Sequence, residues 1–409
     1  MKPLLSSSSS SLFSSDTSLT SYSSQETSTS SLHSNLSLQT LPSIPSLQKP
    51  SLDHQSLSNL SVSHLCVHSF KPQITHITCL AVSENLLYAA SGSEINVFDL
   101  RDYTHLDAFN DQHSDSGSVK SIAFCDGKVI TAHQDCKIRL WGITAMKRHT
   151  LLATLPTVTD RLRRFILPKN YVSVRRHQKR LWIEHIDAVS GLAVNNGFIY
   201  SVSWDKCLKI WRSNDLLCLE SVKAHEDAIN AVAVSGDGTV YTGSADRRIR
   251  VWGKAYGTKR HGLIATLEKH KSAVNSLAVS QDGSVLFSGA CDRSILVWER
   301  EDSAHHMVVT GALRGHKGAI LCLVNISDML ISGSEDRTIR IWQKCGDNNS
   351  RYNVLTVLEG HEKPVKSLIA VLVSDRVVSV CSGSLDGEIK IWKIEISRSS
   401  ASSRLLRWN

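Results

Sequence analysis

Histidine, serine or threonine, and aspartate recur together along this chain, and a nucleophilic hydrolase combines the same side chains. Six aspartates each follow a hydroxyl residue by four positions and a histidine by about twenty, and each precedes a tryptophan by six. The six sets are His113, Thr131, Asp135 and Trp141; His185, Ser201, Asp205 and Trp211; His225, Thr242, Asp246 and Trp252; His270, Ser288, Asp292 and Trp298; His316, Ser332, Asp336 and Trp342; and His361, Ser382, Asp386 and Trp392. A hydrolase needs one activated nucleophile beside one oxyanion hole, whereas this pattern occurs six times. We therefore predict that the sets stabilise a fold, and that the chain is not an enzyme and uses no cofactor.

The tryptophans mark a period that runs through most of the chain. Counting Phe98 in the first slot, they are separated by 41 to 50 residues, apart from one interval of 70. The sequence between them, for example AVNSLAVSQDGSVLFSGACDRSILVWE at 273–299, alternates apolar and polar residues and is interrupted by turn residues, which is typical of antiparallel strands. The repeated four-residue pattern resembles that of the WD-repeat family, whose repeats form the four-stranded blades of a β-propeller.

This resemblance covers about residues 62–396 and implies an all-β, seven-bladed propeller. In such blades the aspartate lies in a tight turn and accepts a hydrogen bond from the histidine, and the chain of bonds ends at the tryptophan indole N–H. Because an unpaired buried donor costs about 1–3 kcal/mol, this network would hold each blade in shape. The first repeat departs from the pattern, since Gln73 occupies the histidine slot, the aspartate is missing and Phe98 replaces tryptophan.

A ring of blades must close, because open ends would leave two exposed strand edges. The last repeat ends near Ile396 without an outer strand, and residues 62–70, VSHLCVHSF, resemble the outer strands of other repeats. We predict that they complete the seventh blade. His64, Cys66 and His68 would then share one face of that strand, and an outward edge face is favoured over a metal site because no fourth ligand is evident.

The composition outside the repeats predicts a low-complexity leader and a short tail. The chain has 409 residues and a net charge of +8, but residues 1–61 hold 23 serines and only five charged residues, which predicts disorder. Residues 397–409 form the tail. Ten scattered cysteines without a Cys-x-x-Cys pair indicate a reducing compartment. We expect the cytoplasm or the nucleus or both, and disfavour an organelle transit peptide because the first arginine is Arg101. No run of eighteen apolar residues predicts a membrane span.

One insert interrupts the regular period. Residues 156–184 lie between the second and third blades, and from 160 to 184 they hold eight basic residues against two acidic ones. YVSV and LWI flank the run RRHQKR, which favours a short β-hairpin with a basic tip on the face that carries the aspartate turns. The basic residues that we expect to contact a partner are Arg175, Arg176, Lys179 and Arg180.

Other candidate contact residues lie on the same predicted face. Trp204 and Glu335 directly precede the aspartates of their repeats, and exposed aromatic residues often dominate interface energies. Packing of Trp204 against the insert is an equal alternative. The starts of the inner strands would add Lys120, Asn230, Asn275 and Lys366. Since arginine pairs well with carboxylate and phosphate, we predict an acidic or phosphorylated protein partner, and leave a solvated loop without a partner as the alternative for the basic run.

The insert and the serine-rich leader resemble the plant WD-repeat proteins of the JINGUBANG type, on the residues NYVSVRRHQKRLWIEHIDAVSGL at 170–192. This resemblance implies a regulatory scaffold of plant cells, in a group associated with restraint of pollen germination. Two alternatives remain. The run Phe98-Asp99-Leu100-Arg101 approaches the motif of substrate receptors of cullin-type ubiquitin ligases, with phenylalanine in place of tryptophan. The basic insert could also bind nucleic acid or a phosphoinositide, although no glycine-aromatic stacking motif accompanies it.

Overall fold

Strands are the predominant secondary structure in the part of the chain that the computed structural model describes, which is residues 60–71, 76–110, 116–175, 178–254, 257–258, 260–301, 307–345 and 352–398. The leader before residue 60, the tail after 398 and the predictions for Gln73, His113 and Arg176 lie outside these residues. The described strands form seven four-stranded antiparallel sheets and one two-stranded sheet.

Each of the first six blades consists of four strands that are consecutive in the chain and adjacent in the sheet. Blades one to three contain β2 (Ile77–Ser83), β3 (Leu86–Ser91), β4 (Glu94–Asp99) and β5 (His105–Phe109); β6 (Val119–Cys125), β7 (Lys128–His133), β8 (Ile138–Ile143) and β9 (His149–Leu155); and β12 (Val189–Asn195), β13 (Phe198–Ser203), β14 (Cys207–Arg212) and β15 (Cys218–Lys223). Blades four to six contain β16 (Ile229–Val234), β17 (Val240–Ser244), β18 (Ile249–Lys254) and β19 (His261–Leu267); β20 (Val274–Val279), β21 (Val285–Ala290), β22 (Ile295–Arg300) and β23 (Met307–Leu313); and β24 (Ile320–Ile326), β25 (Met329–Ser334), β26 (Ile339–Lys344) and β27 (Tyr352–Leu358).

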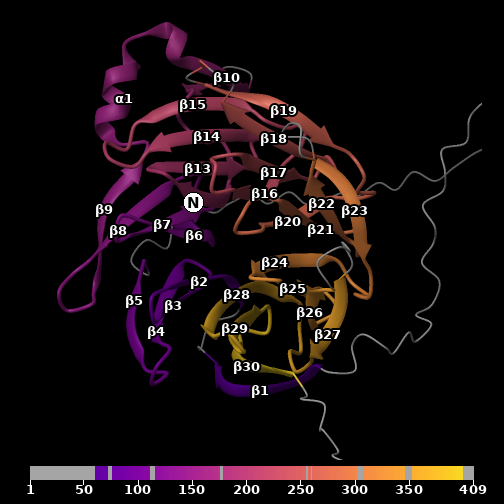
Figure 1. Cartoon of the computed structure of the whole chain (residues 1–409). Helices are drawn as coiled ribbons and strands as arrows, with labels where there is room; N and C mark the ends of the chain where they lie inside the picture. Colours follow the sequence, from indigo (N-terminus) through magenta and orange to yellow (C-terminus); the bar gives the residue numbers. More distant parts are fainter. Residues whose placement is uncertain are drawn as a thin grey trace, which may run out of the picture. The chain divides into compact units, whose positions relative to one another are not determined.

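The blades stand around a ring, as Figure 1 shows. The first strand of every blade is innermost, and each inner strand contacts the inner strand of the next blade, from β2 through β6, β12, β16, β20 and β24 to β28, which contacts β2 again. The predicted seven-bladed propeller is therefore confirmed. We call the end of the ring that carries the aspartate turns the upper face.

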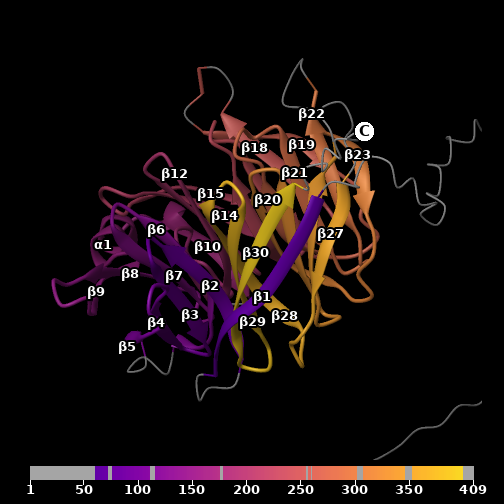
Figure 2. The ribbon, with the colours of Figure 1, turned by 60° about the horizontal axis from the view of Figure 1, so that its bottom comes forward.

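The seventh blade joins the two ends of the propeller. It consists of β28 (Val365–Ser374), β29 (Val377–Ser384), β30 (Ile389–Arg398) and, as its outer strand, β1 (Leu60–Phe70), which pairs antiparallel with β30 from Leu60↔Arg398 to Phe70↔Ile389. Figure 2 shows β1 alongside β30. Closure by an N-terminal strand is thus confirmed. β1 starts two residues before the expected residue 62, and β30 ends two residues after the expected 396.

A bulge in β1 overturns the expectation that His64, Cys66 and His68 share one face. The register with β30 shifts between Cys66 and His68, so the alternation of side chains breaks there. His64 bonds to Thr356 of blade six through Nδ1 at 3.2 Å, whereas the ring of His68 stacks on Tyr103 next to blade one, with 4.6 Å between the ring centroids. The three side chains therefore do not form a ligand set.

The cores lie between neighbouring blades, where glycine permits the closest approach. Gly289 of β21 faces Ile320 of blade six, and a Cβ at Gly289 would lie only 2.4 Å from Cγ2 of Ile320. Gly383 meets Ile77 of blade one in the same way, at 2.5 Å. Such distances leave no space for a side chain, so the glycines set the spacing of the blades.

The insert contains the predicted hairpin and also a helix that was not predicted. β10 (Tyr171–Arg175) pairs with β11 (Gln178–Leu181), so the hairpin is confirmed. Before it come α1 (Val158–Phe165) and the 3-10 helix η2 (Pro168–Asn170). Thr157 caps the N-terminus of α1, since its hydroxyl accepts a hydrogen bond from the Asp160 N–H.

Candidate interaction surface

The repeated histidine sets form complete hydrogen-bond chains in blades three to seven. In blade three, His185 Nδ1 lies 2.8 Å from Asp205 Oδ2 and His185 Nε2 lies 2.8 Å from the Ser201 hydroxyl, which also accepts from the Trp211 indole at 2.9 Å. The other four chains have the same connections, in the sets of His225, His270, His316 and His361.

The proton positions in this chain of bonds follow from the Asp205 carboxylate, which can only accept. Nδ1–H of His185 therefore donates to Asp205, Nε2 of the neutral ring accepts from the Ser201 hydroxyl, and the Ser201 oxygen accepts from the Trp211 indole. Burial lowers the pKa of His185 although Asp205 opposes this, which keeps the ring neutral. The hydroxyl of Ser201 bonds to a histidine that a carboxylate orients, as in a catalytic triad, but Ser201 is completely buried. A substrate cannot reach this oxygen, and the chain of hydrogen bonds therefore stabilises the fold.

In blade two the structure adds a histidine that was not predicted. His113 lies outside the described residues, and the Thr131 hydroxyl pairs with His133 Nε2 at 2.7 Å while it accepts from Trp141 at 2.9 Å. Asp135 accepts two bonds from Arg139, at 2.7 and 3.2 Å. His133 lies two residues after the hydroxyl, where Ser203 stands in blade three, so its identity was visible in the sequence but its role was not.

Among the described residues, one group has the spacing of metal ligands: His361, Asp386 and Glu388, whose ligand atoms lie within 4.8 Å of one another. Both ring nitrogens of His361 already bond, to Asp386 and Ser382. Glu388 accepts from Ser69 of β1 and, at 3.0 Å, from Lys390. These contacts fasten blade seven to its closing strand, and we assign no metal to them.

A bulge lies near the start of every inner strand, at the upper face. The register shift repeats in all seven blades, and a bulge of this kind re-aims the side chain of the extra residue. The residues at the shift are Thr78, Lys120, Ser190, Asn230, Asn275, Leu321 and Lys366.

Most polar members of this ring tie one blade to the next. The amide of Asn230 donates to the carbonyl of Val274 at 3.0 Å, and that of Asn275 donates to the carbonyl of Ile320 at 3.0 Å. The hydroxyls of Thr78 and Ser190 make equivalent bonds, at 2.7 and 2.5 Å. Asn230 and Asn275, predicted as contact residues, thus have their amide groups engaged within the ring.

The two lysines of the ring differ from the other polar members. Neither Lys120 nor Lys366 forms an ion pair with a described residue. Lys120 Nζ lies 5.5 Å from the centre of the Trp204 ring, and burial together with the charge of Lys366 lowers its pKa. Trp204 is 40% exposed. We call Lys120, Trp204 and Lys366 the channel-mouth cluster, because the two lysines lie near the upper starts of β6 and β28, two of the inner strands that surround the centre of the ring. Trp204 therefore packs beside Lys120 of blade two.

Glu335 stands apart from this cluster, on blade six. It is exposed, and its carboxylate accepts from the Ala319 N–H at 3.2 Å. Phe98, in the ligase-like run, is buried, and Arg101 makes two 3.1 Å bonds to Asp99.

The insert is fastened to the outer wall of blade three by its helix. Buried Asp160 accepts from Arg164 Nε at 2.7 Å and from the Cys218 N–H at 3.2 Å, and Arg164 donates to the Cys218 carbonyl at 2.9 Å. The Arg164 guanidinium also covers the Trp182 ring at 4.5 Å. Cys218 begins the outer strand at the end away from the upper face, since Lys223 at its other end pairs with Cys207 beside the aspartate turn. The expectation that the insert lies on the upper face is therefore wrong for α1.

After the hairpin the chain returns to the upper face, where His185 bonds to Asp205. The positive charge of Arg180 opposes the rise in pKa that burial and Asp187 cause at the Cys136 thiol, so Arg180 lies within electrostatic range of the aspartate turn of blade two. Lys179 and Arg180 are both exposed. Nothing is described of Arg176 or of the side chain of Arg175.

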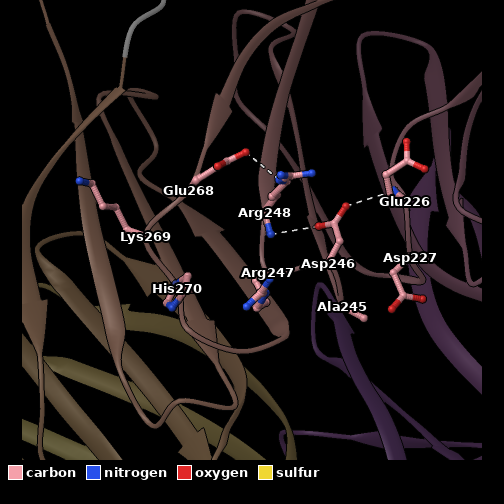
Figure 3. Close-up of a pocket in the computed structure, with 9 residues that line it drawn as sticks. All are labelled: Glu226, Asp227, Ala245, Asp246, Arg247, Arg248, Glu268, Lys269 and His270. Atoms are coloured by element: carbon pink, nitrogen blue, oxygen red, sulfur yellow. Dashed lines mark hydrogen bonds and ion pairs between the residues drawn. The ribbon is translucent and has the colours of Figure 1, made fainter. Parts of the chain in front are cut away.

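A pocket of about 670 Å³ opens between blades four and five, and Figure 3 shows its lining. It is formed by Glu226, Asp227, Ala245, Asp246, Arg247, Arg248, Glu268, Lys269 and His270. Arg248 pairs with Glu268 at 2.7 Å, and its N–H donates to Asp246 at 3.0 Å. Because both signs of charge line the walls, the pocket does not select one class of ligand.

Comparison with known proteins agrees with this architecture. The family model described as WD domain, G-beta repeat matches residues 177–212, 216–253, 262–299, 307–343 and 352–393. The chain is a WD-repeat protein. Curated relatives include telomerase protein component 1 of Rattus norvegicus (24% identical, 53% of this chain, 9% of the relative), autophagy-related protein 16 of Arabidopsis thaliana (26%, 44% and 33%) and the ribosome biogenesis protein WDR12 homolog of Trichoplax adhaerens (25%, 53% and 54%).

This WD-repeat protein spans at most about half the length of these relatives, and their names differ widely. The propeller is the shared part, and WD-repeat propellers generally act as protein-interaction scaffolds without enzymatic activity. The first two blades lie outside the matched segments, and in blade one Phe98 also replaces the tryptophan of the repeat. No helix among the described residues is long and apolar enough to cross a membrane.

Proposed function

We propose that this chain is a non-enzymatic scaffold that holds an acidic or phosphorylated protein partner through the channel-mouth cluster and the basic hairpin. The observation that carries the proposal is the pair Lys120 and Lys366. In a ring where most polar side chains are bonded to the next blade, these two cations have no carboxylate partner among the described residues.

The chemistry of the cluster favours an anion. Lys366 disfavours the charged form of Lys120, so a carboxylate or phosphate bound between them would relieve the repulsion. Trp204, partly exposed beside Lys120, adds a flat apolar surface of the kind that anchors interfaces. Lys179 and Arg180 would extend the positive potential toward the rim and speed the encounter with an acidic partner.

Affinity purification with quantitative mass spectrometry tests this proposal. Wild-type chain is compared with K120S/K366S, with W204A and with K179S/R180S, and K128S serves as the control because Lys128 is an exposed lysine at the far end of blade two. We expect the wild type to capture acidic or phosphorylated proteins that elute with salt. The captured amount of these proteins should fall at least tenfold with each of the three test variants and should not change with K128S. Partners that all variants retain at high salt would contradict the proposal.

We further propose that the chain is a plant regulator of the JINGUBANG type, which acts in the cytoplasm or the nucleus. Support comes from the resemblance of residues 170–192 and of the serine-rich leader. Loss of the protein from pollen should then advance germination, and wild-type chain but not K120S/K366S should restore the delay. Unchanged germination would reject this finer assignment, whereas the purification experiment judges the scaffold itself.

A further inference from the structure

The outward side of α1 is apolar. Val158, Leu162 and Phe165 follow one another at spacings of four and three residues and are 73%, 64% and 65% exposed. At about 100° of rotation per residue they fall on one stripe of the helix. Ile166 and Leu167, directly after the helix, continue the apolar surface and are also exposed. We call these five residues the α1 ridge.

The helix cannot turn this ridge inward, because its opposite side is anchored. Asp160 and Arg164 lie about half a turn from the stripe, and both bond to the backbone of Cys218. The cation–π contact between Arg164 and Trp182 adds a third attachment. Figures 1 and 2 both show α1 outside the ring of blades. The ridge is therefore held toward solvent, where contiguous exposed apolar side chains mark an interaction site.

The charges around the ridge are positive. Arg163 in α1 and Lys169 in η2 are exposed. The two carboxylates of the insert are already paired, Asp160 with Arg164 at 2.7 Å and Glu184 with Arg161 at 3.3 Å. An apolar stripe one helix wide, bordered by two cations that form no ion pair with a described residue, is complementary to an amphipathic helix that carries acidic residues beside its own apolar stripe.

We propose that the α1 ridge is a docking site for an acidic amphipathic helical segment of a partner protein. The inference rests on the proposed scaffold function but uses residues on the outer wall of the propeller, which are separate from the channel-mouth cluster. The two surfaces can therefore fail or succeed independently.

A peptide-display selection tests the ridge and does not require the partner to be identified. Wild-type chain is used to select from a library of displayed random 16-residue peptides, and the L162E/F165E variant is used to remove peptides that bind elsewhere. Selected peptides are synthesised with a fluorophore, and their affinities are measured by anisotropy at low and at high salt. L263E is the matched control, because Leu263 is a similarly exposed leucine on the outer strand of blade four.

The expected peptides carry apolar residues at spacings of three and four together with aspartate or glutamate. Their affinity should fall at least tenfold in L162E/F165E and in R163S/K169S, remain unchanged in L263E and K120S/K366S, and weaken with salt. Selection of no peptide, or of basic peptides, would overturn the inference. So would binding of wild-type chain, but not of L162E/F165E, to phosphatidylserine vesicles in place of peptides, or a dimer of the wild-type chain that the double variant abolishes. The variants must retain the wild-type melting temperature. If L162E/F165E does not, L162S/F165S replaces it.

Discussion

The hydroxyl groups of Ser201, Thr242 and Ser288 occupy the position that a catalytic nucleophile would have, yet none has any exposed surface. Each accepts from an indole and also hydrogen-bonds to a histidine ring nitrogen, so its hydrogen-bonding capacity is used within the blade. At the scale of single residues, burial separates a structural chain of bonds from a reactive one. The types and spacing of the residues are the same in both.

Removing the aspartate of one hydrogen-bond chain should lower the stability of the fold and change nothing else. D292A leaves His270 without its carboxylate partner and also frees the Lys271 N–H, so we expect the free energy of unfolding to fall by about 2–4 kcal/mol. Thermal denaturation measures the change. E359A, at an exposed glutamate, should melt like the wild type. An unchanged melting temperature of D292A would contradict the structural role of the chain.

Acid should weaken the fold through the same groups. Burial lowers the pKa of His185, His225, His316 and His361 in the folded state, so these rings bind fewer protons than in the unfolded chain. Stability from a lowered pKa is fully present above the unfolded value, about 6.5 for histidine, and is lost as the pH falls through the folded value.

The melting temperature should therefore decrease steadily from pH 7 to pH 5. A further loss should follow below about pH 4, the unfolded range of aspartate, because His185 and the Ile186 N–H lower the pKa of Asp205 to about 2 although burial alone would raise it. Differential scanning calorimetry over pH 3 to 8 checks both steps. A melting temperature that rises between pH 7 and pH 5 would show that the histidines are charged in the fold.

At the scale of elements, the repeat could be predicted and its interruptions could not. The spacing of Trp252 and Trp298 predicts strands because each tryptophan must return to the same buried slot. The bulge at residue 67 was invisible, since alternation predicts a face only while the ladder stays in register, and this moved His68 away from His64. α1 was missed because strand patterns surround it, although Thr157 and the spacing of Leu162 and Phe165 are signals of a short helix.

The residues of the candidate site could likewise be predicted only in part. The sequence pattern located the inner-strand starts, so Lys120 and Lys366 were predicted as contact residues. Which members of the ring remain unpaired depends on bonds between blades, such as that of Asn275 to the Ile320 carbonyl, and these join residues far apart in the chain. A pattern within one repeat contains no information about such bonds.

The close approach of neighbouring blades gives a prediction for the glycine in β21. G289V would place methyl groups where Ile320 Cγ2 and Ser276 Oγ lie, at 2.4 and 2.7 Å from the new Cβ, so we expect a loss of about 3 kcal/mol or more, or failure to fold. G262V is the matched control, because Gly262 lies in outer strand β19 with no atom within 4 Å of its Cβ position. Chemical denaturation followed by tryptophan fluorescence measures both. Equal denaturation midpoints for G289V and G262V would show that the blades can separate at no cost in stability.

At the scale of the whole molecule, stability depends on closure of the ring. β1 covers the edge of β30, and without it the seventh blade would expose a ten-residue strand to other chains. A chain that starts at residue 71 should therefore melt at a lower temperature and aggregate, whereas one that starts at residue 57 should behave like the full chain. Light scattering during heating compares them. Identical curves would mean that the closing strand is dispensable.

The pairing of Leu60 with Arg398 also has a consequence for how the protein is made. During translation β1 leaves the ribosome first, but its partner β30 is among the last described segments to appear. At about 5–20 residues per second, the early strand must wait on the order of 15–70 s for its neighbour. Blades one to six can assemble as they emerge, because each is contiguous in sequence. The seventh cannot, so throughout synthesis the nascent chain carries an unpaired apolar strand, which is the kind of segment that chaperones bind.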